Sequence, residues 1–565
     1  MKNLFRLNIF IITILFVISC NEQLNQVPTV APSSETFYSS EEELILAING
    51  VYNQTLWFEV TPWNLPAPLR FETGTDLSFE RMGLGMKSVT AGNSDSQTGI
   101  FSDTWNHLYR SISQANGLLQ NMSRAEDVVS EDLFERIQAE ARFLRAFSYH
   151  YLTELYGDVP LLVEVPTIEE AQIARTPKQD VVDQIYEDLD YAAQVLPTDW
   201  PEAEKGRITK GAALALKARV ALYNENWSLA VQSTQAVMDL GKYELYQNYE
   251  DQFQYQGEHS SGVILDTDYE KSVHATSYAR FFGSRNITGW STVVPSQFAV
   301  DSYEAIDGKP IDESSVYDPG NPFQNRDPRL DASIVRAGGV WDDFIFQDHP
   351  DSVETWRVNS AGERVEKVSN QDATNPFSTF TGYLWRKYYS PIDRNDLASS
   401  SLNFIYIRYA EVLLTYAEAM IEMGEIDQSV LNAINLVRAR AYGVELTQGS
   451  MYPEITTTNP TELREIIRRE RKVEFAGEGL RLFDIKRWGI ADEVVNGTLI
   501  GRPLGDYSSI PKAPEIDENG SPMYSGMENL FRNVEERVFT EKDWFWAIPQ
   551  SELDLNDKIT QNVGY

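Results

Sequence analysis

The stretch that decides the fold reads EARFLRAFSYHYLTELYGDVPL and runs from Glu140 to Leu161. From Phe134 onward, apolar or small residues recur every three or four positions, which is the period of an amphipathic α-helix. The repeat stops at Gly157, a residue type that can close a helix in the left-handed conformation, and Pro160 follows it. This stretch predicts one long, largely buried helix with a defined C-terminal end.

The same helical period surrounds this stretch, in places as pairs of helices. A capping box at Ser40 and Glu43 starts one helix, and Thr176-Pro177 starts another. Two further stretches turn near residues 224–226 and 424–425, with small residues before the turn and apolar residues after it. A repeat of about 34 residues with these features is typical of tetratricopeptide helix pairs, although any antiparallel helix hairpin would fit it equally well. We therefore expect a mainly α-helical fold.

The helical period fades in two regions that are rich in glycine, proline, asparagine and aromatic residues, namely 60–100 and 250–400. Loop regions of this length inside a folded chain usually carry function. We expect a single body over residues 35–565, divided into an N-terminal helical half (35–250), a loop-rich insert (250–400) and a C-terminal helical half (400–565).

The first residues are typical of a secretory signal followed by a lipid anchor. A positively charged start precedes twelve almost wholly apolar residues, 7–18, a run that is too short to span a bilayer. The run ends in Val-Ile-Ser-Cys at Cys20, the chain's single cysteine, and this is similar to a bacterial lipobox. An ordinary signal peptide with an incidental cysteine is the alternative. We expect a signal peptide at 1–19, and a lipidated Cys20 with a flexible tether over 20–34.

Composition excludes several classes of protein. The chain of 565 residues has 84 acidic and 48 basic residues, a formal charge of −36, which argues against binding to nucleic acid. One cysteine excludes a disulfide framework and any metal site built from several cysteines, and the five histidines have no zinc-enzyme spacing. Residues 517–520 faintly resemble a calcium loop, but an ordinary turn explains them better. We expect no cofactor and no metal.

Motifs of covalent catalysis are missing from the sequence. It has no GxSxG nucleophile elbow and no phosphate-binding GxxxxGK loop. With 84 carboxylates, some pair will lie at the spacing of a glycosidase by chance, so the number of carboxylates says nothing about hydrolysis. The sequence therefore favours a binding protein over an enzyme.

Many motifs along the chain, in order, resemble the SusD/RagB-like outer-membrane lipoproteins of Bacteroidetes, nearly from end to end. The stretches that carry the resemblance include Ala47–Tyr52, Trp105–Tyr109, Glu140–Leu161, Ile407–Ala419, Arg469–Glu474, Gly479–Gly489 and Gln561–Tyr565. The resemblance implies a mostly α-helical body with tetratricopeptide-like helix pairs and a loop-rich ligand-binding side. We expect the charged residues of these motifs to form structural ion pairs and caps, mainly along single helices: Arg142, Arg145, Arg408, Glu411, Arg471, Glu474, Arg481, Asp484 and Arg487.

The resemblance also implies a function. Such a protein is anchored to the outer membrane, faces the cell surface and covers a SusC-like TonB-dependent transporter. It captures an oligosaccharide or polysaccharide, occasionally a peptide, and delivers it unaltered to the transporter. Two alternatives of other classes stay open, namely a lipid-anchored tetratricopeptide-type scaffold for protein–protein interaction and an anchored polysaccharide-degrading enzyme.

Aromatic loops suit sugar capture because a sugar ring packs its C–H face on a flat side chain, while its hydroxyls need polar partners. We expect the rings of Trp290, Trp341 and Trp356 to bind the ligand, because each lies in a loop rather than on a motif helix. For Trp105, Trp227 and Trp488, which lie on motif helices, core packing is the expectation. The expected polar partners are Arg70, Asp76, Arg81 and Asn93 in the early loop region. For each of the loop tryptophans Trp290, Trp341 and Trp356, filling a gap under a loop is as good an explanation as ligand binding. The net negative charge of the chain disfavours a polyanionic ligand unless the loops are locally basic. Five arginines of the loop-rich insert leave that possibility open: Arg280, Arg285, Arg326, Arg329 and Arg336.

Overall fold

The computed structural model describes residues 37–60, 62–167 and 170–565. The expected signal peptide, Cys20 and the tether lie outside the described residues. Within the described part, no helix is both long enough and apolar enough to cross a bilayer.

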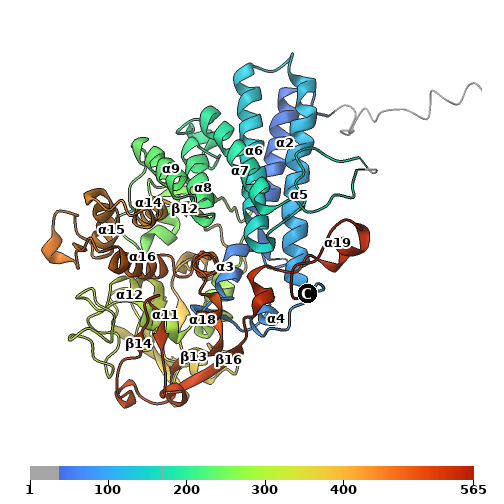
Figure 1. The fold of residues 1–565 in the computed structure, drawn as a ribbon. Helices are drawn as coiled ribbons and strands as arrows, with labels where there is room; N and C mark the ends of the chain where they lie inside the picture. The colour runs from blue at the N-terminus through green and yellow to red at the C-terminus, as the bar shows by residue number, and fades with distance from the viewer. Residues whose placement is uncertain (1–36, 61, 168–169) are drawn as a thin grey trace, which may run out of the picture.

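The described residues form a mainly α-helical fold, as the sequence predicts (Figure 1). The long helices α2, α5, α6 and α7 lie side by side at one end of the molecule, while short strands and loops gather at the other end. The helices up to residue 250 are α2 (Glu41–Leu56), α3 (Ala67–Glu72), α4 (Lys87–Thr90), α5 (Gly99–Asn121), α6 (Glu131–Tyr156), α7 (Lys178–Val195), α8 (Lys210–Tyr223) and α9 (Trp227–Asp239). The later helices are α10 (Tyr278–Phe282), α11 (Gln297–Ser302), α12 (Arg329–Ser333), α13 (Gln371–Thr374), α14 (Tyr409–Met423), α15 (Gln428–Ala441), α16 (Pro460–Glu474), α17 (Arg481–Arg487), α18 (Ala491–Val495) and α19 (Gln550–Leu555).

Helix α6 contains the stretch from Glu140 to Tyr156, and the prediction of a long buried helix is confirmed. Ser130 caps its start by accepting a hydrogen bond from the backbone N–H of Leu133. Gly157 ends it with φ of +75°, a conformation that costs glycine little. Most side chains from Ile137 to Tyr156 are buried, and α6 packs against α5 and α7.

Both expected helix hairpins are present. Helices α8 and α9 pack on each other across the turn at Asn224–Asn226, and α14 packs on α15 across a turn at Gly424, whose φ is +73°. Helix α9 also packs against α14, so the two hairpins contact each other although about 170 residues separate Asp239 from Tyr409.

Short antiparallel strands organise the loop-rich regions. The strands are β1 (Glu59–Val60), β2 (Leu65–Pro66), β3 (Ser78–Glu80), β4 (Val263–Thr267), β5 (Val293–Pro295), β6 (Ile334–Val335), β7 (Val340–Trp341), β8 (Phe344–Ile345), β9 (Glu354–Val358), β10 (Arg364–Ser369), β11 (Leu384–Trp385), β12 (Phe404–Arg408), β13 (Gly497–Pro503), β14 (Glu515–Ile516), β15 (Pro522–Met523) and β16 (Phe531–Arg537). Strands β7 to β10 form one sheet in the order β10-β9-β8-β7, and β4 pairs with β12. Strand β3 pairs with β5, so that Phe79 lies opposite Val294. This last pairing brings the early loop region beside the middle one.

A buried cluster of charged residues surrounds Glu474 at the end of α16. Its carboxylate accepts hydrogen bonds from Arg329 at 2.9 Å, from Arg408 at 2.6 Å and from Arg440. Burial by itself would raise the pKa of Glu474, but these three guanidinium groups outweigh it and hold that pKa well below its usual range. The cluster thereby connects α12, β12, α15 and α16.

The expectation that the charged motif residues form structural ion pairs is confirmed for most of them, but the expected location along single helices is mostly wrong. Arg145 pairs with Asp188 of α7, and Arg481 pairs with Asp76, more than 400 residues away. Arg487 pairs with Asp484 in the same helix and also with Glu418 of α14. Helical spacing shows which charges share a helix face, whereas the partner on the neighbouring element depends on how the helices pack.

We expect Glu474→Gln to lower the free energy of unfolding by about 3–5 kcal/mol, because it leaves three buried guanidinium groups short of their counterion. Chemical denaturation at pH 7 measures this loss. The matched control is Glu354→Gln, which removes an exposed partner of Lys367 and should change the stability by less than about 0.5 kcal/mol. Equal stability of the two variants would contradict the structural role of Glu474.

The stabilising effect of Glu474 should depend on pH. The folded pKa of this carboxyl is depressed, so its contribution is fully present above the unfolded pKa of about 4.3 and is lost as the pH falls toward the folded value. The difference in unfolding free energy between the wild type and Glu474→Gln should therefore be constant from pH 7 to 5 and should shrink below about pH 4. A difference that grows in acid would contradict this sign.

Candidate ligand-binding site

Two tryptophans from distant loops meet where β3 and β5 pair. Trp290 follows α10, and Trp63 lies just before β2. Their ring centroids are 5.2 Å apart in an edge-on arrangement, and the buried ring of Phe281 lies 5.4 Å from Trp290. Both tryptophans are half-buried. Their rings are therefore supported from the protein side and still reach the surface.

Three arginines surround Trp290. The guanidinium of Arg280 lies 5.2 Å from the centroid of the Trp290 ring. Arg81 donates from Nη2 to the backbone oxygen of Trp290 at 3.3 Å and to the hydroxyl of Thr292 at 3.1 Å. Arg285 donates from Nη1 to the backbone oxygen of Gly289 at 2.8 Å. Cationic groups and an indole ring thus share one small surface.

Exposed apolar side chains extend this surface. Phe377 lies under the guanidinium of Arg81 at 5.2 Å, and 54% of it is exposed. Met82 and Phe380 are exposed by 55% and 41%. We call the surface formed by Trp63, Arg81, Arg280, Arg285, Trp290 and Phe377 the Trp290 platform. It offers flat rings for C–H groups and guanidinium donors for hydroxyl or acidic groups of a ligand.

A buried carboxylate fixes the loop that carries Trp290. Asp372 on α13 accepts hydrogen bonds from the Ser284 hydroxyl, from the backbone N–H of Arg285 at 2.7 Å and from the Asn286 amide at 2.7 Å. Burial raises the pKa of Asp372 to about 6. A Cβ on Gly289 would lie 2.3 Å from the backbone oxygen of Gly283, so the loop closes too tightly there for any other residue. The loop before Trp290 is consequently held in one conformation.

The structure separates the three tryptophans that the sequence predicted as one binding surface. Trp341 on β7 is only 2% exposed and packs on Tyr389 with ring centroids 4.2 Å apart, so neither face of its ring is open to a ligand. Trp356 on β9 is half-buried, with the guanidinium of Arg364 5.8 Å from its ring. Among the described residues, neither of them makes a ring contact with the Trp290 platform. Only Trp290 belongs to it.

Of the four predicted polar partners, only Arg81 belongs to the platform. Arg70 on α3 and Asp76 before β3 are 3% and 2% exposed. Asp76 accepts two hydrogen bonds from Arg481, at 2.9 and 3.0 Å, and pairs with Lys472 at 3.0 Å. Its carboxylate is thus already occupied inside the protein, and burial likewise keeps Arg70 from a ligand. Asn93 is exposed in the loop after α4.

Trp63 and Phe377 were not among the residues predicted from the sequence. Each follows a proline, in Pro62-Trp63-Asn64 and Asn375-Pro376-Phe377, where no helical or strand period calls for a large ring. An aromatic residue in a turn of this kind is therefore a signal of a surface ring. This signal does not show that the loop with Trp63 lies beside the loop with Trp290. That contact depends on the pairing of β3 with β5, and strands of only three residues cannot be matched from the sequence.

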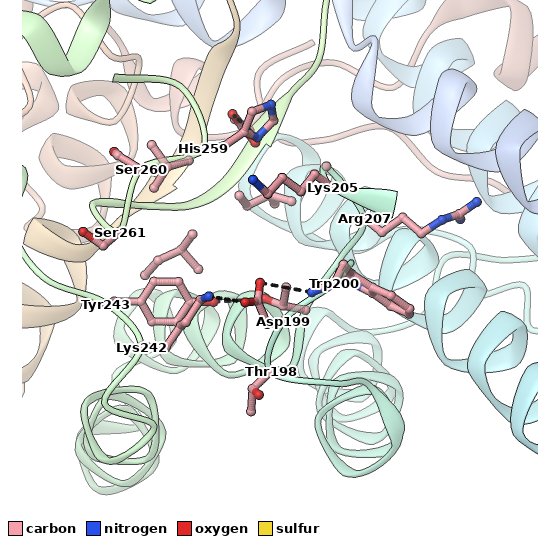
Figure 2. Close-up of a pocket in the computed structure, with 16 residues that line it drawn as sticks. Thr198, Asp199, Trp200, Lys205, Arg207, Lys242, Tyr243, His259, Ser260 and Ser261 are labelled. Carbon is pink, nitrogen blue, oxygen red and sulfur yellow. Dashed lines mark hydrogen bonds and ion pairs between the residues drawn. The ribbon is translucent and has the colours of Figure 1, made fainter. Parts of the chain in front are cut away.

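A second candidate site is a cavity of about 300 Å³ beside β4 (Figure 2). It is lined by residues that include Trp200, Lys205, Arg207, Lys242, Tyr243 and His259. An adjoining hollow of about 310 Å³ shares three lining residues of the loop before α8, Lys205 to Arg207. The charged groups of the cavity already have partners: Lys242 pairs with Asp199, as the dashed line in Figure 2 marks, and Arg207 pairs with Glu140 and Glu204. The Trp200 ring lies 4.9 Å from the guanidinium of Arg136.

One group of described residues beside this cavity could hold a metal ion, with donor atoms of His259, Asp266 and Asp268 within 4.8 Å of one another. Burial, followed by the charge of Asp268, raises the pKa of Asp266. Asn403 donates to both carboxylates, at 3.1 and 2.8 Å, and His259 lies 3.5 Å from Asp268. Because these neighbours already contact both carboxylates, we assign no ion to the group.

Comparisons with known proteins give a consistent result. Residues 247–565 match the family model described as the SusD family, and residues 34–222 match the one described as starch-binding associating with outer membrane. A SusD-like protein of Formosa agariphila is 27% identical over 511 residues, which cover 86% of this chain and 90% of that protein. The crystal structure of a SusD-like carbohydrate-binding protein of Bacteroides fragilis is similar at 30% identity and a TM-score of 0.78, covering 93% of this chain and all of that one. A laminarin-binding SusD-like protein shares the fold at 21% identity and a TM-score of 0.67, covering 94% of this chain and all of that one.

We expect Asp372→Ala to loosen the Trp290 loop, because three donors lose their buried acceptor. The stability should fall by about 1–3 kcal/mol. Amide hydrogen exchange over residues 283–290 should speed up by at least about tenfold, while exchange in α6 stays slow. Asp351→Ala, which removes an exposed carboxylate, is the control. Unchanged exchange in the loop would show that Asp372 does not hold it.

Proposed function

Because this chain belongs to the SusD/RagB family of Bacteroidetes, we propose that it is a glycan-binding lipoprotein of the outer membrane. In this proposal it captures an oligosaccharide or polysaccharide at the cell surface and hands it, chemically unchanged, to a SusC-like TonB-dependent transporter. Cys20 would carry the lipid, and residues 20–34 would tether the body to it. The outer-membrane description of the matched family model and the carbohydrate-binding relative from Bacteroides fragilis support this assignment.

The Trp290 platform is the observation that carries the proposal. It combines the half-buried rings of Trp63 and Trp290 with an exposed Phe377 and with guanidinium donors that lie beside the rings. A sugar ring stacks its C–H face on such a surface and directs its hydroxyls to donors at the edge. The cavity beside β4 offers fewer free groups, because Lys242 pairs with Asp199 and Arg207 pairs with Glu140 outside the cavity lining.

The platform predicts weak binding, which suits release to a transporter. A stacked aromatic contact contributes roughly 0.5–1.5 kcal/mol beyond the burial of its area. Two or three such contacts together with a few hydrogen bonds lead to dissociation constants of roughly millimolar to micromolar.

We expect Trp290→Ala to weaken glycan binding by about tenfold or more, because it removes the central ring and the support of Trp63. A glycan array with the lipid-free protein first identifies a bound polysaccharide, and affinity electrophoresis then compares the variants. Trp200→Ala is the matched control, because it removes a half-buried tryptophan from the cavity beside β4. Circular dichroism verifies that both variants fold.

The outcomes separate the competing functions. Loss of binding in Trp200→Ala but not in Trp290→Ala would place the ligand in the cavity. Normal glycan binding by both variants would contradict both sites, and no binding to any glycan would favour the protein-binding scaffold. Shorter sugars released from the polysaccharide, detected by chromatography, would instead show an enzyme.

A further inference from the structure

Within the described part of the chain, the three arginines of the Trp290 platform lack a carboxylate partner, whereas many buried arginines of this acidic protein have one or more. In the body, Arg329, Arg408 and Arg438 each pair with two or more carboxylates. Across residues 37–60, 62–167 and 170–565, in contrast, no carboxylate oxygen lies within 4 Å of a side-chain nitrogen of the three platform arginines. These are Arg81, Arg280 and Arg285. With 84 acidic residues against 48 basic ones, three unpaired arginines at one spot are a specific feature.

Two of these arginines also repel each other. Burial, followed by the charge of Arg285, lowers the pKa of Arg81. The Nε–H groups of Arg81 and Arg285 are buried and have no acceptor in the described part of the protein. Burial also lowers the pKa of Arg285, and the charge of Asp372 partly offsets this lowering. Asp372 lies beneath the loop, however, where it is 1% exposed and accepts hydrogen bonds from the Ser284 hydroxyl, the Arg285 backbone and the Asn286 amide. Among the described residues, no carboxylate therefore pairs with the three guanidinium groups beside the rings.

We infer that the Trp290 platform selects glycans that carry acidic groups, namely uronate carboxylates or sulfates. This inference rests on the proposed function and adds the class of ligand to it. A sugar that stacks on Trp290 places the substituents at its edge next to Arg280, which lies against the same ring. An anionic substituent there supplies the missing counterion and accepts hydrogen bonds from a planar guanidinium.

The physical basis is the difference between an anion and a hydroxyl as a partner for arginine. A charge-assisted hydrogen bond is roughly twice as strong as a neutral one, and guanidinium groups match carboxylate and sulfate geometry with two parallel bonds. Burying a charge without a partner costs free energy that an anionic ligand returns on binding. A neutral sugar makes the stacking contacts but leaves the repulsion between Arg81 and Arg285 in place.

The test uses pairs of polysaccharides that share a backbone and differ in whether they carry acidic groups. Dextran sulfate with dextran tests sulfate, and polygalacturonate with its methyl ester tests carboxylate. A glycan array carrying acidic glycans beside their neutral counterparts widens the choice of backbone. We expect the acidic member of a bound pair to bind at least about tenfold more tightly. Equal binding of both members, or a best ligand on the array without any acidic group, would overturn the inference.

Variants connect this preference to the platform. Arg280 makes no side-chain hydrogen bond to any described residue, so Arg280→Gln should fold normally. It should lower the affinity for the acidic glycan by about tenfold and weaken binding of the neutral counterpart much less, so that the ratio of acidic to neutral affinity falls. Arg280→Lys should retain most of the preference. Arg110→Gln makes the same change of charge on an exposed residue of α5 and serves as the control.

The two levels of the proposal fail in different ways. Trp290→Ala should weaken both members of a pair, because stacking does not depend on charge. If Trp290→Ala loses binding while Arg280→Gln keeps an unchanged ratio of acidic to neutral affinity, the ligand class is wrong and the glycan-binding function stands. If Trp290→Ala binds like the wild type, the proposed site itself fails.

Discussion

The structure depends on neutralising charge that is buried between elements distant in the sequence. Glu474 lies at the centre of this arrangement, because three arginines from α12, β12 and α15 reach its carboxylate. A buried ion is stable only when its partners are in place, so these elements must assemble together. A second buried pair extends the same principle to the loops. Asp76 is held by Arg481 and Lys472, and it stands two residues before β3, the strand that pairs with β5.

Arginine therefore has two separate uses in this protein. In the interior its guanidinium forms pairs with carboxylates that join helices and strands, and such groups are unavailable to a ligand. Around Trp290 the same side chain is half-buried, lacks a carboxylate partner and lies against aromatic rings. Leaving a charge without a carboxylate partner costs stability, so three such arginines beside rings that reach the surface support the proposal that this surface binds a ligand.

Membership of the family determines the architecture but not the cargo. A neighbour at 21% identity still has a TM-score of 0.67, which shows that helix packing persists while most side chains change. The ligand must then be argued from the site and not from the fold. In this chain the proposed site depends on how one short loop is closed, by Asp372 from one side and by the tight approach of Gly289 to Gly283 from the other.

The sequence alone determined the helices, because the burial of one helix face repeats every three to four residues and is visible in α6, in the two hairpins and in the end at Gly157. Its lack of periodicity also indicated the loop regions in which the proposed site lies, and two of the residues predicted from it, Trp290 and Arg81, belong to the Trp290 platform. Only the tertiary structure decided which loop residues meet. Strands of three residues carry no readable register, so the contact between Trp63 and Trp290 could not be foreseen. A tryptophan outside the helices can be buried, as Trp341 is, or can reach the surface, as Trp290 does. Which of the two occurs depends on the segments that pack against it. The burial of Asp76 likewise depends on tertiary packing, because its partner Arg481 lies more than 400 residues away in the sequence.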